Sequence, residues 1–120
     1  MDAAVDRLVD LRYLDDRLFA EGHVRRRSAT RGPLALSAEL AARGVERALA
    51  DRAVQGIDPE SQLAAATRLV ERMAGQKAFA GYRELLDSTG PKLVRRGFAP
   101  GIVRRACRAV WEGTVPASEA

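Results

Sequence analysis

The chain has 120 residues, of which 47% are hydrophobic and 5% aromatic, and it carries a formal net charge of +4. This length is enough for one domain with a modest core, which Leu, Val and Ala must fill because aromatic residues are scarce. No run of apolar residues is long enough for a transmembrane helix, so no membrane contact is expected. The acidic, periodic start of the chain is unlike a signal peptide. Cys107 is the single cysteine and cannot form an internal disulfide, which fits a reducing, cytoplasmic compartment.

Hydrophobic residues recur with the 3.6-residue period of helices and no segment alternates with period 2, so the sequence predicts an all-α fold. In the first half, the helices are expected over residues 2–11, 15–27, 33–43 and 46–55. Pro33 suits a first helical position, and Gly44 suits a left-handed cap just after a helix. Leu36, Leu40 and Leu49 are expected in the core.

In the second half, Asp58 can cap a helix that has Pro59 just inside it and ends near Gly75. Residues 78–88 are expected to form a further helix. Gly90-Pro91 repeats the start signal of Gly32-Pro33, and Gly97 repeats the stop signal. A last helix is expected over about residues 100–112. The apolar positions expected in this half of the core are Leu63, Ala66, Val70, Met73, Leu85, Leu86, Ile102, Val103, Ala106 and Val110.

An internal repeat relates residues 40–54 to residues 93–107, at an offset of 53 residues. Each copy has a helix, a glycine stop, an apolar residue and a short helix. The matching pairs are Leu40 and Leu93, Arg43 and Arg96, Gly44 and Gly97, Val45 and Phe98, Leu49 and Ile102, and Ala53 and Ala106. A degenerate third copy has Arg12 in the glycine position, followed by Tyr13. Such units cannot bury their apolar faces alone, so the copies are expected to stack.

Three stretches in this order together resemble the RecX family, which regulates the RecA recombinase. The first stretch contributes Tyr13, Leu14, Asp15, Asp16, Phe19, Ala20, Val24 and Arg27. The second contributes Gly32, Leu36, Glu39, Leu40, Arg43, Gly44 and Val45. The third contributes Arg95, Arg96, Gly97, Phe98, Ile102 and Val103. The chain departs from the family at Arg12, where a glycine is usual, at His23, where an aromatic residue is common, and at Gly90-Pro91, which interrupts a commonly continuous helix.

The resemblance implies an elongated, curved, all-helical protein built from tandem three-helix repeats. Family members usually have two more helices before the segment that begins here. Residues 1–12 are therefore expected to be the third helix of a first repeat, 13–56 a second repeat, 57–112 a third repeat, and 113–120 a disordered tail. The resemblance also implies binding to RecA, to RecA–DNA filaments and to DNA. It further implies inhibition of recombinase, ATPase and co-protease activities in DNA repair and the SOS response. A monomer is expected.

Two basic blocks, residues 22–32 and 91–111, contain no acidic residue. Their arginines could contact phosphates without sequence preference, or pair with acidic groups of a protein. The candidate contact residues are Arg25, Arg26, Arg27, Arg31, Arg43, Lys92, Arg95, Arg96, Arg104, Arg105 and Arg108. Solvated arginines on helix surfaces remain an alternative. A general DNA-binding protein without a recombinase partner and a helical adaptor also remain open.

No residue pattern predicts catalysis, a metal site or a cofactor site. Asp15 and Asp16 point about 100° apart on a helix and converge poorly on a metal ion, so Asp15 is interpreted as an N-cap and Asp16 as a first-turn carboxylate. His23 lacks a nucleophile nearby and is expected at the edge of an aromatic-sized space. Cys107 is expected to be buried, and Trp111 to cover the end of the core, with base stacking as the alternative. Phosphate-binding glycine motifs are absent from the sequence, so no enzyme is expected.

The "YLDD" stretch is interpreted as a helix junction. Tyr13 is expected to fill a gap between two helices, and Phe19 to anchor the second of them.

Overall fold

The computed structural model describes residues 3–114, and this range contains helices and no strand. The helices are α1 (Ala3–Arg27), α2 (Pro33–Ala42), α3 (Arg47–Gln55), α4 (Pro59–Ala74), α5 (Tyr82–Arg95) and α6 (Pro100–Thr114). The predicted all-α repeat fold is confirmed.

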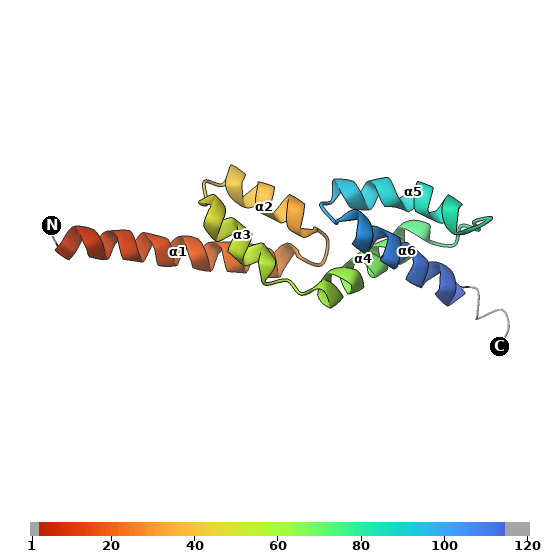
Figure 1. Cartoon of the computed structure of the whole chain (residues 1–120), viewed down its shortest axis with the longest axis horizontal. Coiled ribbons are helices and arrows are strands. Elements are labelled where there is room, and N and C mark those ends of the chain that lie inside the picture. The colour runs from red at the N-terminus through yellow and green to blue at the C-terminus, as the bar shows by residue number, and fades with distance from the viewer. Residues whose placement is uncertain (1–2, 115–120) are drawn as a thin grey trace.

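The molecule is elongated, with principal extents of 71 × 24 × 20 Å. Its radius of gyration is 18.8 Å, whereas a compact chain of this length would have one of about 14 Å. Figure 1 shows two groups of three helices lying end to end, α1 to α3 and α4 to α6, with the first half of α1 projecting beyond the first group. We call this projecting part, residues 3–16, the arm.

Each group has its own hydrophobic core. In the first, Leu36 and Leu40 of α2 are fully buried and pack with Ala20 and Val24 of α1 and with α3. The buried α3 residues are Leu49, Ala50 and Val54. The predicted positions Leu36, Leu40 and Leu49 are thus core residues, as their helical spacing indicated.

The second core joins α4, α5 and α6 around Val70, Leu93, Phe98 and Ala106. Cys107 is fully buried there, as predicted, and its Sγ lies 3.3 Å from the Thr89 hydroxyl. Burial raises the pKa of the Cys107 thiol, and the hydrogen bond with Thr89 opposes this only in part. The thiol therefore stays protonated and serves as an apolar core group. Trp111 packs against the same core and is partly buried.

The two groups meet where the loop before α2 contacts the turn between α5 and α6. The Gly32 amide donates to the Arg96 carbonyl at 2.8 Å, and the Leu34 amide donates to the Gly97 carbonyl at 3.2 Å. A Cβ on Gly97 would lie 2.3 Å from the Ala35 amide nitrogen, and a Cβ on Gly32 would lie 2.4 Å from the Gly97 carbonyl carbon. Glycine at both positions therefore allows two backbones to touch. We call this contact the joint.

The predicted helix stops are confirmed. Gly44, Gly75 and Gly97 have φ angles of 85°, 55° and 95°, which L side chains rarely adopt. The predicted cap at Asp58 is also confirmed, because its carboxylate accepts from the Ser61 amide at 2.7 Å. That bond, together with the Ser61 hydroxyl, lowers the pKa of the Asp58 carboxyl.

The predicted break at residues 12–14 is wrong, because α1 runs without interruption from Ala3 to Arg27. Asp15 is therefore not an N-cap and Asp16 is not in a first turn. Nothing between Arg12 and Leu14 breaks a helix, and the residue that replaces the usual glycine is arginine, a good helix former. Tyr13 fills no gap, since it lies within the helix and its side chain is 46% exposed.

The predicted break at Gly90-Pro91 is also wrong, because α5 continues through both residues and begins at Tyr82 rather than Ala78. Pro91 has no N–H, so it cannot donate the helical hydrogen bond to the Asp87 carbonyl. A helix can tolerate the loss of one such bond when its core contacts are good. Gly90 is a buried residue inside α5 rather than part of a turn. A Cβ there would make ordinary van der Waals contacts with Leu86 at 3.4 Å and with Val103 at 3.6 Å.

The last helix extends two residues past its predicted end, to Thr114. The rest of the predicted tail, 115–120, lies outside the described residues. The repeat boundaries at 12/13 and 56/57 stay predictions.

Candidate partner-binding surface

The basic candidates divide into those engaged within the molecule and those left exposed. Arg27 and Arg31 are engaged with one carboxylate, that of Glu39 on α2. Nε of Arg27 lies 2.7 Å from Oε1, and Nε of Arg31 lies 3.8 Å from Oε2. Arg27 lies at the end of α1 and Arg31 in the loop that follows it, so both side chains connect this part of the chain to α2 and contribute to the fold before any partner is present.

His23 completes this cluster. Its Nε2 lies 2.9 Å from Oε1 of Glu39, so the tautomer that carries a proton on Nε2 donates to the carboxylate. The imidazole is buried, and Phe19 stacks on it with ring centroids 6.0 Å apart. His23 is thus buried and stacks with Phe19. Phe19 is 38% exposed, and because this contact lies within α1, it does not tie that helix to another element as the sequence had led us to expect.

The neighbouring side chains change the pKa of the Glu39 carboxyl. Partial burial acts to raise the pKa of its carboxyl, but the hydrogen bond from His23 and the positive charge of Arg27 outweigh burial. The pKa therefore lies below its usual value, and Glu39 is ionised at neutral pH. We call His23, Arg27, Arg31 and Glu39 the Glu39 cluster.

Three further candidates are engaged elsewhere. The Arg96 guanidinium donates to the Thr30 carbonyl at 3.3 Å, across the joint. The Arg108 guanidinium lies 4.0 Å from the centre of the Tyr82 ring, which is a cation–π contact. Arg105 pairs with Glu60 at 3.7 Å, but both side chains are more than half exposed, so this pair stabilises the fold little.

Among the described residues, the other six candidates make no side-chain ion pair or hydrogen bond. They are Arg25, Arg26, Arg43, Lys92, Arg95 and Arg104. Two of them, Arg95 and Arg104, share a groove of about 660 Å³ between α5 and α6. We call it the α5–α6 groove. Its charged lining residues are Arg83, Asp87, Arg95 and Arg104, and its other lining residues are Leu86, Gly90, Pro91, Val94, Pro100 and Val103.

Arg104 connects this groove to a second hollow, which it lines together with Tyr82, Arg105 and Arg108. The structure thus brings Arg95, Arg104, Arg105 and Arg108 together on one surface of the second group. Arg83 belongs to this surface and was missed from the sequence. Treating α5 as one continuous helix would have found it, because Arg83, Asp87 and Val94 follow at offsets of four and seven residues.

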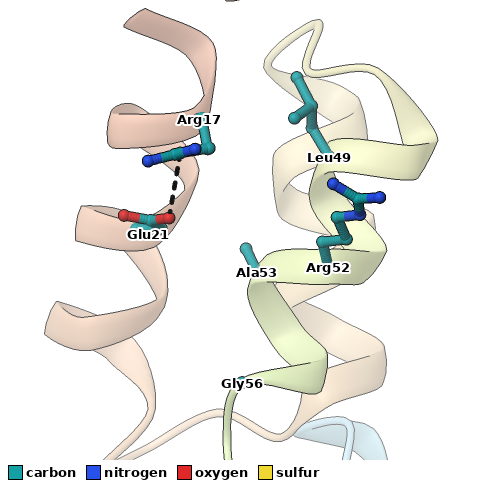
Figure 2. Close-up of a pocket in the computed structure, with 6 residues that line it drawn as sticks. All are labelled: Arg17, Glu21, Leu49, Arg52, Ala53 and Gly56. Atoms are coloured by element: carbon teal, nitrogen blue, oxygen red, sulfur yellow. Dashed lines mark ion pairs between the residues drawn. The ribbon is translucent and has the colours of Figure 1, made fainter. Parts of the chain in front are cut away.

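A hollow of about 420 Å³ also lies between α1 and α3. Figure 2 shows its lining: Arg17 and Glu21 on α1, paired at 3.5 Å, stand across from Leu49, Arg52 and Ala53 on α3. Its single carboxylate is already paired, and Arg52 is its one further charge. The candidates Arg25 and Arg26 lie beyond it at the end of α1, and Arg43 lies at the end of α2. The structure does not bring these three together with the α5–α6 surface.

Within residues 3–114, no three His, Cys, Asp or Glu side chains are placed to hold a metal ion. None of the helices in that range is long and apolar enough to span a bilayer.

Comparisons with known proteins identify the fold and the family. The family model for "RecX, second three-helix domain" matches residues 15–54. The regulatory protein RecX of Thermobifida fusca is 35% identical over 118 residues, which cover 93% of this chain. The chain belongs to the RecX family. RecX of Geobacillus kaustophilus is 30% identical over 105 residues, or 86% of this chain.

The chain is shorter than these RecX relatives. It matches 62% of the T. fusca protein and 39% of the G. kaustophilus protein. A crystal structure of RecX from Lactobacillus salivarius superposes with a TM-score of 0.76 at 23% identity, covering 88% of this chain and 70% of that one. This likeness establishes the fold that the two proteins share.

Proposed function

We propose that this chain is a cytoplasmic, non-enzymatic regulator of the RecA recombinase. It binds RecA and RecA–DNA filaments and inhibits recombinase, ATPase and co-protease activities in DNA repair and the SOS response. The observation that carries the proposal is the combination of RecX family membership with an elongated structure that carries exposed arginines around α5 and α6.

The shape supports binding along a filament. At 71 Å, the molecule is about three times longer than it is wide, so it can contact several neighbouring subunits of a polymer at once. Contacts to successive subunits raise affinity through effective concentration without any single strong site.

The charge distribution supports a polyanionic or acidic target. Arg95 and Arg104 on the α5–α6 surface are exposed, and neither is paired with any described acid. Exposed guanidinium groups pair with phosphates or carboxylates and speed encounter with an oppositely charged surface. The Glu39 cluster and Arg96, in contrast, are committed to internal contacts, so we assign them to the fold rather than to partner binding.

The DNA-dependent ATPase of the cognate RecA tests the proposal when this chain is titrated into the reaction. We expect the rate to fall with added chain, and the triple variant R104E/R105E/R108E to inhibit at least about tenfold less strongly, since charge reversal replaces attraction with repulsion. The control variant R68E/R72E reverses two exposed arginines on α4, neither of which lines the α5–α6 groove or the hollow beside it, and should inhibit like the parent chain. An unchanged rate at saturating parent chain would refute the proposal.

A general DNA-binding protein without a recombinase partner is the second candidate, and the same exposed arginines favour it. It predicts sequence-independent binding to single- or double-stranded DNA that weakens steeply with salt. Binding to naked DNA with no effect on the ATPase, at salt where both proteins occupy DNA, would favour this candidate.

A further inference from the structure

The hollow beside the α5–α6 groove, of about 480 Å³, brings three arginines of α6 to one place. Arg104, Arg105 and Arg108 line it, and all three side chains are exposed. We call it the arginine hollow. Among its described lining residues, Tyr82 is the only aromatic one and Glu112 the only acid. Positive charge therefore exceeds negative charge in this hollow.

Tyr82, the first residue of α5, is held between the second core and α6. Its side chain packs against that core, and its hydroxyl donates to the main-chain carbonyl of Arg104 at 3.2 Å. Just before it, the Ala80 amide donates to the Glu84 carboxylate at 2.9 Å, which fastens the start of α5. The tyrosine ring therefore has a defined position relative to the backbone of α6.

Arg108 lies over this ring, with its guanidinium carbon 4.0 Å from the ring centroid. Unlike a salt bridge, a cation–π contact pairs no carboxylate with the guanidinium, so its N–H donors remain available to an external oxyanion. No described carboxylate or carbonyl pairs with the Arg108 guanidinium. Tyr82 thus orients Arg108 without occupying the groups that bind a partner.

The other arginines show why this orientation matters. Arg27 is also held in place, but by the Glu39 carboxylate at 2.7 Å, which uses its donor group. Arg104 is unpaired and exposed, so it loses side-chain freedom when it binds. Arg108 is both restricted and unpaired. It therefore loses less conformational entropy on binding than a free arginine does.

We propose that Tyr82 is a positioning residue, which presents Arg108 to the phosphate backbone of DNA bound at the arginine hollow. Arg108 donates to one phosphate, and Arg104 and Arg105 contact its neighbours. Guanidinium donors match phosphate oxygens, and three of them along one helix suit a strand with regularly repeated charges better than a single carboxylate. The inference rests on the DNA contact that is part of the proposed function.

Fluorescence anisotropy of a short labelled DNA single strand, titrated with the whole chain, tests the proposal. Tyr82→Leu removes the ring and should weaken binding about three- to fivefold, the loss expected for one exposed cation–π contact. Tyr82→Phe keeps the ring and should bind like the parent chain. The matched control Tyr13→Leu makes the same change at the other tyrosine, on α1, and should also bind like the parent chain. Equal binding by Tyr82→Leu and the parent chain would overturn the proposal.

A double-mutant cycle separates positioning from a general loss of structure. Arg108→Gln removes the group that Tyr82 positions, so adding Tyr82→Leu to it should weaken binding by less than about twofold more. A purely structural role would weaken binding equally in both backgrounds, and that result would also overturn the proposal. Urea denaturation of each variant establishes that the chain is folded during the titration.

The two proposals fail in different ways. If the parent chain binds no DNA, the positioning role of Tyr82 is wrong, while inhibition of the RecA ATPase through protein contacts still supports the proposed regulator. If the parent chain binds DNA and leaves the ATPase unchanged, the proposed regulator is wrong, and the Tyr82 variants still decide the positioning role.

Discussion

The turns that end α2 and α5 have the same sequence pattern but different surroundings. Gly44 and Gly97 both adopt positive φ and end a helix. Around Gly97, the space that a Cβ would fill is occupied by Ala35, whereas no atom lies within 4 Å of such a Cβ on Gly44. One motif thus serves as a cap in both repeats and as a contact between repeats in only one of them.

A repeated motif therefore defines the local turn, while the elements packed against the turn determine its further contacts. The helices that precede the two turns, α2 and α5, also differ in their contacts. Glu39 of α2 holds α1 through the Glu39 cluster, while Lys92, at the equivalent position of α5, is exposed. Three pairs of substitutions test this comparison, in order of decreasing expected effect, and a fourth pair compares two aspartates elsewhere in the chain.

The apolar residue after each glycine provides the first pair. Phe98 is 1% exposed and is among the largest fully buried side chains, whereas Val45 is smaller and 7% exposed. We expect Phe98→Ala to lower the free energy of unfolding by about 3–5 kcal/mol and Val45→Ala by about half as much, because the larger side chain leaves the larger cavity. Urea denaturation followed by circular dichroism measures both values, and equal losses would contradict the comparison.

The glycines themselves provide the second pair. Gly97→Ala would place a methyl group 2.3 Å from the Ala35 nitrogen, at a φ of 95°. We expect a loss of more than about 2 kcal/mol, from strain and clash together. Gly44→Ala should lower the free energy of unfolding by about 1 kcal/mol, from backbone strain alone. If the two variants unfold at the same urea concentration, the joint does not contribute as described.

The third pair compares Glu39 with Lys92. Glu39→Gln removes a charge that binds His23 and Arg27, so we expect a loss of about 1 kcal/mol at neutral pH. Lys92→Gln should change stability by less than about 0.5 kcal/mol because the side chain is exposed. Both values come from urea denaturation.

The Glu39 loss should depend on pH. Because the folded-state pKa of Glu39 lies below the ordinary glutamate value of 4.5, the contribution of its charge to stability is complete above that value. It disappears as the pH falls through the folded pKa. The difference between the parent chain and E39Q should therefore shrink below about pH 4.5. A difference that grows on acidification would contradict the assignment.

The smallest effects concern two aspartates that look like helix caps. Asp58 caps α4, so Asp58→Ala should lower the melting temperature more than Asp15→Ala does. Asp15 lies inside α1 and is exposed, so Asp15→Ala should change stability by less than about 0.5 kcal/mol. Thermal unfolding in the same buffer compares them, and a larger loss for Asp15 would restore the helix break that the structure removes.

Much of the fold could be predicted because its signals are local. Gly44, Gly75 and Gly97 lie where the chain needs positive φ, and the apolar spacing in α2, α4 and α6 identified most of the core. The two errors came from signals whose meaning depends on surroundings. Aspartate can cap a helix or lie within one, and Asp15 lies within α1. Pro91 does not begin a helix, because Leu85 and Leu93 on either side of it are both buried in the core and keep α5 continuous.

The candidate surface was harder to predict than the fold. Sequence blocks correctly grouped Arg95 and Arg104, but they did not distinguish these from Arg27, Arg31 and Arg96, which contact groups far away in the sequence. The partner of Arg96 is the Thr30 carbonyl on the other repeat, and that contact exists only once the joint has formed. A sequence block records charge, whereas the fold decides which charges remain available.

Co-precipitation of the purified proteins tests our proposal that the chain binds RecA itself. Tagged chain and cognate RecA are mixed, treated with nuclease and washed at moderate salt. The account predicts that RecA is retained by the parent chain and by R68E/R72E, and is lost with R104E/R105E/R108E. Release of RecA from the parent chain after nuclease treatment would contradict the account and leave DNA as the shared ligand.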